Sequence, residues 1–131
     1  LVCKHIFDRF GVRSTDYIDI RLLEVLLWLR EGIGKPITIN TWDSGGQFSQ
    51  RGYRCNMCEM VKSKKQAYLS AHTRGQAFDL DVKGMTALEV RQWIDDHKAT
   101  LPHNIRLESG VTWVHVDICN ETDKKIVYFD D

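Results

Sequence analysis

Two short segments in which apolar and ionisable residues alternate constrain the fold of this chain more than any other feature. The segments are residues 76–82 (QAFDLDV) and 112–118 (TWVHVDI). Successive side chains of a β-strand point to opposite faces, so strict alternation is typical of a strand with one buried face. Asp79 and Asp81 alternate with apolar residues in the first segment, as His115 does in the second. Each segment is therefore predicted to be a strand with its ionisable side chains on one face.

A third segment, residues 104–108 (NIRLE), shows the same alternation, with Ile105 and Leu107 opposite Arg106 and Glu108. The economical arrangement packs all the apolar strand faces under helices. The other face of the sheet then carries a dense group of ionisable residues: Asp79, Asp81, Arg106, Glu108, His115 and Asp117. Solvated strand faces are polar as well, but a repeated choice of histidine and aspartate indicates a functional surface.

The remaining segments predict an α+β domain. Helices are expected at residues 2–10, 17–31 and 86–99, and further strands at residues 36–40 and 125–129. Gly32, Gly34 and Pro36 are expected to end the second helix, and a capping box from Thr86 to Glu89 opens the third. Short turns join the last three strands, which are expected to form an antiparallel meander.

Length and charge limit the possible functions. The 131 residues fit a single domain, residues 1–131. The 18 basic and 18 acidic residues cancel, which argues against nucleic acid or an anionic membrane surface as the partner. The longest apolar stretch, residues 22–29, is interrupted by Glu24 and is far shorter than the roughly 18–20 residues that cross a bilayer. We expect a monomer that binds neither nucleic acid nor membrane.

The cysteines bear on the compartment and on metal binding. Four cysteines in 131 residues are too few for a disulfide scaffold, and LVCKHIFDRFG lacks the order of a signal peptide. We expect synthesis in the cytoplasm with reduced cysteines. Cys55 and Cys58 have zinc-knuckle spacing, but a structural zinc site needs four ligands. Cys3 and Cys119 lie far away in the sequence, although folding could bring either close, and His5 is expected at the surface.

The central segment, residues 43–69, has two adjacent glycines, scattered polar residues and no sustained periodicity. A loop this long within a compact domain is usually functional or disordered. Its aromatic residues and arginines favour an ordered, functional loop.

Two histidines and one aspartate make a candidate metal site. His115 and Asp79 belong to the polar strand face, and His72 lies seven residues before Asp79, with Gly75 allowing a turn between them. Three such ligands leave a zinc ion with an open position and a net charge near +1, which suits water activation and carbonyl polarisation.

The motifs around these residues resemble a known family. The pattern S-x-H-x-x-G-x-A-x-D is formed by Ser70, His72, Gly75, Ala77 and Asp79, and it is accompanied by RGYR at 51–54 and WVHVD at 113–117. These motifs, in their order along the chain, resemble those of the D-alanyl-D-alanine carboxypeptidase and Hedgehog-like zinc peptidases. The resemblance is in particular to small phage or prophage peptidoglycan peptidases. The resemblance implies a small antiparallel sheet with helices on one face and a zinc cleft on the other.

The resemblance also implies site residues. It makes His72, Asp79 and His115 the ligands of one zinc ion, and Arg54 the partner of an oxyanion or a substrate carboxylate, with Arg51 as the competing candidate. Gln50, Arg51 and Ser70 are expected to bind substrate. The implied substrate is the stem peptide of bacterial peptidoglycan, cleaved at a bond that involves D-Ala, by an endolysin-like or a DD/LD-carboxypeptidase-like enzyme that acts on the cell wall.

The general base is the point where the chain departs from the family. Many relatives have a catalytic glutamate three residues before the last histidine, where this chain has Thr112. Glu108 is the nearest replacement, although it could instead pair with Arg106 or a lysine. Asp81 and Asp117 are interpreted as groups that orient the histidines. The absent glutamate also keeps an alternative open, a non-catalytic zinc-binding structural module of a phage particle.

Overall fold

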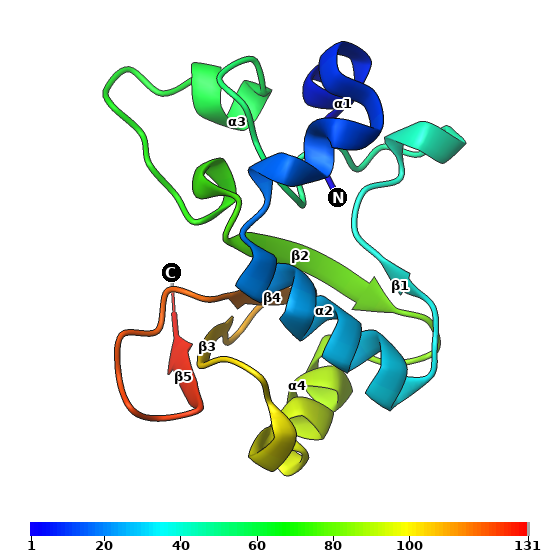
Figure 1. Cartoon of the computed structure of the whole chain (residues 1–131), viewed down its shortest axis with the longest axis vertical. Coiled ribbons are helices and arrows are strands. Elements are labelled where there is room, and N and C mark those ends of the chain that lie inside the picture. Colours follow the sequence, from blue (N-terminus) through cyan, green and yellow to red (C-terminus); the bar gives the residue numbers. More distant parts are fainter. Residues whose placement is uncertain (131) are drawn as a thin grey trace.

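Figure 1 shows the computed structural model of the chain, which describes residues 1–130. It is a mixed α+β fold, as the sequence predicts. The helices are α1 (Lys4–Phe10), α2 (Ile20–Ile33), α3 (Glu59–Lys62) and α4 (Ala87–Asp96), with 3-10 turns η1 (Gly11–Tyr17), η2 (Trp42–Ser44), η3 (His72–Arg74) and η4 (Lys98–Thr100). The strands are β1 (Ile37–Thr38), β2 (Ala77–Val82), β3 (Ile105–Glu108), β4 (Val114–Asp117) and β5 (Ile126–Phe129).

The helix ends follow from local chemistry. Asp19 caps α2, because its Oδ1 accepts a hydrogen bond from the backbone N–H of Arg21 at 3.0 Å. Gly34 ends α2 in the left-handed conformation, with φ of 70°. The expectation that Gly32 also ends the helix is wrong, because α2 continues through Gly32 to Ile33. The predicted capping box is confirmed at α4, where Thr86 and Glu89 each satisfy a backbone N–H of the other.

Within residues 1–130 the strands form one five-stranded sheet in the order β1-β2-β4-β3-β5. The antiparallel pairing of β4 with β2 and with β3 agrees with the prediction. The expected meander is wrong at its last strand, because β5 pairs with β3 and runs parallel to it. Both edges of β4 are already occupied by β2 and β3, so β5 joins the open edge of β3. The sheet is therefore mixed rather than purely antiparallel.

The strand register places the ionisable residues on one face. Asp79 is opposite His115, while Asp117 is opposite Ala77 on one side and Arg106 on the other. The residues between them belong to a single hydrophobic core shared with α2 and α4, whose sheet members are Phe78, Leu80, Val82, Ile105, Leu107, Val114 and Val116. The prediction of one apolar face under helices and one ionisable face is confirmed.

The segment 43–69 is ordered around short elements. It includes the four-residue helix α3, and Tyr53 forms an isolated parallel bridge with Val2. In Figure 1 this segment and α1 lie together at the top of the view, above β2. Of the helices formed by residues 1–130, none has the length and apolar character needed to span a lipid bilayer.

Candidate metal site and cleft

His72, Asp79 and His115 come together in the folded chain. One potential ligand atom from each lies within 4.8 Å of those of the other two, and all three residues are buried. His72 Nε2 is 3.3 Å from Asp79 Oδ2, and His115 Nδ1 is 2.9 Å from Asp79 Oδ1. The three residues therefore form a candidate metal site.

A turn that requires glycine positions His72. The 3-10 turn η3 ends at Gly75, which has φ of 68° and donates its N–H to the carbonyl oxygen of His72. A Cβ atom at Gly75 would lie 2.1 Å from the carbonyl oxygen of Tyr17. Both the positive φ and the close approach of the Tyr17 backbone exclude a side chain here, so glycine fixes how the chain turns from His72 into β2.

The outer nitrogen of each histidine is held by an acceptor. His72 Nδ1 is 3.0 Å from the carbonyl oxygen of Gly52, and His115 Nε2 is 2.8 Å from Asp117 Oδ2. Carbonyl and carboxylate oxygens accept only, so these nitrogens carry the protons. The opposite nitrogens, His72 Nε2 and His115 Nδ1, face the carboxylate of Asp79. An outer nitrogen held by an acceptor and an inner nitrogen turned toward the site is the arrangement that metal-binding histidines show.

Asp117 is fixed in turn by several donors. It is fully buried, and its two oxygens accept from Arg106 Nε and Nη2, each at 2.9 Å. Asp117 Oδ1 also accepts from the backbone N–H of Cys119 at 3.0 Å. These contacts fix the position of the Asp117 carboxylate, which in turn orients the ring of His115. The carboxylate of Asp81 differs, because it is half-exposed and pairs with Arg51 rather than with a histidine.

The hydrogen bonds between these groups shift their titration. Burial raises the pKa of Asp79, but hydrogen bonds from His115 and His72 outweigh it and hold that pKa well below its usual range. Burial lowers the pKa of His115, but hydrogen bonds to Asp117 and Asp79 outweigh it and raise that pKa to about 9. Asp79 and Asp117 are therefore ionised at neutral pH, and a metal ion bound by His72, Asp79 and His115 would compete with a proton on His115.

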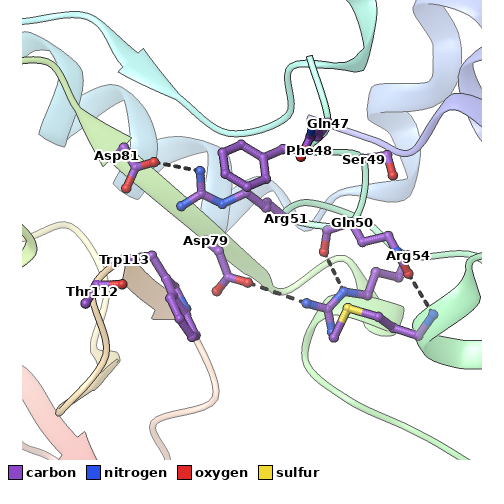
Figure 2. Close-up of a pocket in the computed structure, with 11 residues that line it drawn as sticks. Gln47, Phe48, Ser49, Gln50, Arg51, Arg54, Asp79, Asp81, Thr112 and Trp113 are labelled. Atoms are coloured by element: carbon purple, nitrogen blue, oxygen red, sulfur yellow. Dashed lines mark hydrogen bonds and ion pairs between the residues drawn. The ribbon is translucent and has the colours of Figure 1, made fainter.

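The two candidate arginines have different positions, as Figure 2 shows. Arg54 is buried, with Nη2 3.4 Å from Asp79 Oδ2 and Nε donating to the carbonyl oxygen of Gln50 at 2.5 Å. Arg51 lies farther along β2, where it pairs with Asp81 at 2.8 Å and stacks 4.3 Å from the ring centre of Phe48. Arg54 is therefore the arginine that borders the candidate metal site.

Two adjoining cavities form a cleft over this site. The first, of about 470 Å³, is lined by Gln47, Phe48, Ser49, Gln50, Arg51, Arg54, Met60, Asp79, Asp81, Thr112 and Trp113 (Figure 2). The second, of about 480 Å³, is lined by His72 and His115 and also by Ser70 and Glu108. The two cavities share Arg54, Met60, Asp79 and Trp113 in their walls. Asp79 therefore lies where the two arms of the cleft meet.

The expected substrate-binding residues line different arms. Gln50 and Arg51 line the first cavity, and the side-chain oxygen of Gln50 accepts from the N–H of Met60 at 2.8 Å. Ser70 lines the second cavity, where its N–H donates to Thr73 Oγ1 at 2.9 Å within the turn that carries His72. Glu108 shares the second cavity with the candidate ligands, whereas Thr112 lines the first.

A second group of possible metal ligands lies outside the cleft. Cys3, His5, Cys55 and Cys58 each offer a donor atom within 4.8 Å of those of the others. Of the two distant cysteines considered from the sequence, the fold brings Cys3 to the Cys55–Cys58 pair. Sequence reasoning missed His5 as a candidate ligand, although its spacing of two residues from Cys3 was a signal that could have suggested it.

Comparison with known proteins adds no relative: no protein-family model, no curated protein and no solved structure matches this chain. The resemblance to zinc peptidases therefore stays a prediction from the motifs. The case for function depends on the residues of the site and their geometry.

Proposed function

We propose that this chain is a zinc-dependent peptidase that hydrolyses peptide bonds of bacterial peptidoglycan. The observation that carries the proposal is the convergence of His72, Asp79 and His115 at the floor of a cleft whose walls include Arg54 and Glu108. The proposed fold family is the Hedgehog/DD-peptidase-like group, on the strength of the motifs around these residues. The proposed substrate is a stem peptide, cut at a bond that involves D-Ala.

The donor set fits zinc. Two imidazoles and one carboxylate are a catalytic zinc ligand set that leaves a position open, and the outer contacts of His72 with Gly52 and of His115 with Asp117 keep both inner nitrogens available. When bound, zinc supplies Lewis acidity, which makes water a better nucleophile and a carbonyl carbon a better electrophile. The same ligands also accept other first-row ions, so zinc is the proposed rather than the exclusive metal.

Glu108 is the proposed general base. The antiparallel register that pairs Arg106 with Asp117 and Leu107 with Val116 brings the next residue of β3, Glu108, beside His115. From there its carboxylate would take a proton from the attacking water and pass it to the leaving amine. Its place in the same cavity as the three candidate ligands supports this role.

Arg54 is the proposed electrostatic partner of the reaction. Its guanidinium is always charged and borders Asp79, so it would stabilise the negative charge that develops on the carbonyl oxygen of the scissile bond. Gln50, Arg51 and Ser70 would bind the flanking parts of the peptide. Lys64 and Arg74 add positive charge to the cavity wall, which complements the carboxylates of stem peptides.

The protein's location, oligomeric state and reaction type also belong to this function. We propose that the protein is made in the cytoplasm, acts on the cell wall as a monomer, and works either as an endolysin-like endopeptidase or as a carboxypeptidase. The products separate the last two, because a carboxypeptidase releases free D-Ala and an endopeptidase releases uncrosslinked muropeptides.

A non-catalytic zinc-binding structural module of a phage particle is the second candidate. Thr112 favours it, because this position holds a glutamate in many of the peptidases that the motifs resemble. The two candidates share the metal site and differ only in whether Glu108 performs the chemistry.

The test is the release of muropeptides from purified peptidoglycan, measured by mass spectrometry alongside the zinc content of the protein. Glu108→Gln keeps the shape of the side chain and removes the base, so we expect at least a hundredfold loss of rate with zinc retained. Glu121→Gln, at an exposed position, is the matched control and should cleave as the wild type does. His115→Ala should lose both zinc and activity.

Two results would contradict the peptidase proposal or its mechanism. Zinc binding without cleavage of any peptidoglycan would leave the structural module as the better account. Full activity in Glu108→Gln would exclude Glu108 as the base and direct attention to Asp81 and Asp117.

A further inference from the structure

Three thiols and one imidazole converge away from the cleft. We propose that Cys3, His5, Cys55 and Cys58 bind a structural zinc ion, separate from the candidate metal site. Thiolate and imidazole donors in this ratio are one of the standard closed, four-ligand sets of structural zinc. The proposal does not depend on the peptidase activity.

The distances between the donor atoms match a tetrahedral zinc site. With Zn–S bonds of about 2.3 Å and a Zn–N bond of about 2.0–2.1 Å, tetrahedral geometry separates two sulfurs by about 3.8 Å and a sulfur from a nitrogen by about 3.6 Å. The Sγ of Cys55 is 3.6 Å from that of Cys3 and 4.0 Å from that of Cys58. His5 Nδ1 is 3.7 Å from Cys55 Sγ and 3.8 Å from Cys58 Sγ.

A disulfide does not account for this cluster. The S–S bond is about 2.05 Å long, whereas the sulfur separations are 3.6 and 4.0 Å and the cysteines are free. Buried free cysteines often act as small apolar side chains. Here, however, an imidazole nitrogen with its own polar requirement faces two of the sulfurs, which an apolar cluster would not favour.

The backbone around the cysteines supports thiolate ligands. Cys58 donates its N–H to the carbonyl oxygen of Cys55 at 3.1 Å, and Met57 donates its N–H to Cys55 Sγ at 3.3 Å. An N–H aimed at sulfur stabilises negative charge on it. Cys3 is fixed to the same segment, because its N–H donates to the carbonyl oxygen of Tyr53 at 3.2 Å.

The proposed zinc would join two parts of the chain that share little hydrophobic core. Neither α1 nor α3 buries a residue of its own. Cys3 is the N-cap residue of α1, and Cys58 is the N-cap residue of α3. Together with Cys55 they form a small cluster of buried residues that is separate from the main core. In Figure 1 α1 and α3 lie at the same end of the molecule. A metal ion between their caps would hold this end together.

The same connection reaches the cleft. Cys55 directly follows Arg54, which borders Asp79, and it lies three residues after Gly52, whose carbonyl oxygen accepts from His72. Fixing Cys55 would therefore also fix the cleft wall. We infer that the second zinc is a positioning element for the segment that carries Gln50, Arg51 and Arg54.

Cobalt titration of the reduced, metal-free wild-type chain tests the proposal. Thiolate ligands give Co²⁺ a strong near-ultraviolet charge-transfer band that histidine and carboxylate ligands do not. We expect this band to saturate with one equivalent bound to thiolates, and zinc to displace it. Absence of the band, while circular dichroism shows a folded chain, would overturn the proposal. Because this titration uses the unmodified chain, it tests the proposed zinc site even if the cysteine variants fail to fold.

Variants assign the band and separate the two sites. The Cys55→Ser/Cys58→Ser double variant should lose the band and one of two zinc equivalents, whereas Cys119→Ser, the matched control, should keep both. His115→Ala should lose the other equivalent and retain the band. A band that survives in the double variant would refute the assignment. An inactive protein with an intact band would count against the peptidase proposal only.

Discussion

Replacing Asp117 by asparagine removes one charge from a fully buried carboxylate without changing its shape. Asp117 Oδ2 accepts from His115 Nε2 and Arg106 Nη2, and Oδ1 accepts from Arg106 Nε and the N–H of Cys119. In Asp117→Asn an NH₂ group must replace one of these oxygens. In either orientation of the amide, the NH₂ group faces two N–H donors that the carboxylate oxygen had accepted from.

The magnitude follows from this count. When the amide oxygen stays toward His115, one lost hydrogen bond is from the charged guanidinium of Arg106, at about 1.5–3 kcal/mol. The other is from the neutral N–H of Cys119, at about 0.5–1.5 kcal/mol. The free energy of unfolding should therefore fall by roughly 2–4 kcal/mol. In the opposite orientation the amide NH₂ faces His115 Nε2 and favours the tautomer with its proton on Nδ1, which blocks the nitrogen that faces Asp79. Loss of such an outer partner lowers metal affinity by about 10–100-fold.

Two measurements check this prediction. Isothermal titration calorimetry of the metal-free chain gives the zinc affinity, and urea unfolding of the metal-free chain gives the stability. Asp123→Asn removes the same charge at an exposed position and should change stability by less than about 0.5 kcal/mol. Zinc affinity of Asp117→Asn equal to that of the wild type would refute the argument that Asp117 holds His115 for metal binding.

Two further predictions concern stability. Asp19→Ala removes the cap of α2 and should cost about 1 kcal/mol. A hydrogen bond from Arg21 lowers the pKa of Asp19 to about 2. The stabilisation by Asp19 is therefore complete above about pH 4 and is lost as the pH falls through about 2. The free energies of unfolding of variant and wild type, measured in urea, should become equal at that pH, and a difference that stays constant with pH would contradict the assignment. Gly75→Ala should cost about 1–3 kcal/mol more than Gly84→Ala, because both have positive φ but only Gly75 lies against the backbone of Tyr17; equal melting temperatures would show that the close approach is not rigid.

The sequence predicted the parts of the fold that local patterns control. Alternation in residues 76–82 and 112–118 identified β2 and β4 and the face that each one buries. Thr86 and Glu89 marked the start of α4 because their side chains act on neighbouring backbone groups. The partner of β5 could not be read in the same way, since alternation states which face is buried but not which strand edge is open.

The candidate site also has parts that local patterns predict and parts that depend on how distant segments pack. Motif spacing predicted His72, Asp79 and His115 as metal ligands, and the strand register explains why Asp79 lies opposite His115. The pairing of Asp81 with Arg51 was not predicted, because Arg51 belongs to the irregular segment 43–69 and its position depends on how that segment packs.

The sequence by itself determined which residues share a strand face and where α4 begins, because these depend on neighbours within a few positions. Only the tertiary structure decided that Cys3 and His5 meet Cys55 and Cys58, some fifty residues away. It also decided that Asp117, rather than Asp81, supports His115. Such contacts depend on how distant segments pack, and the energies that select them come from burial shared across the whole fold.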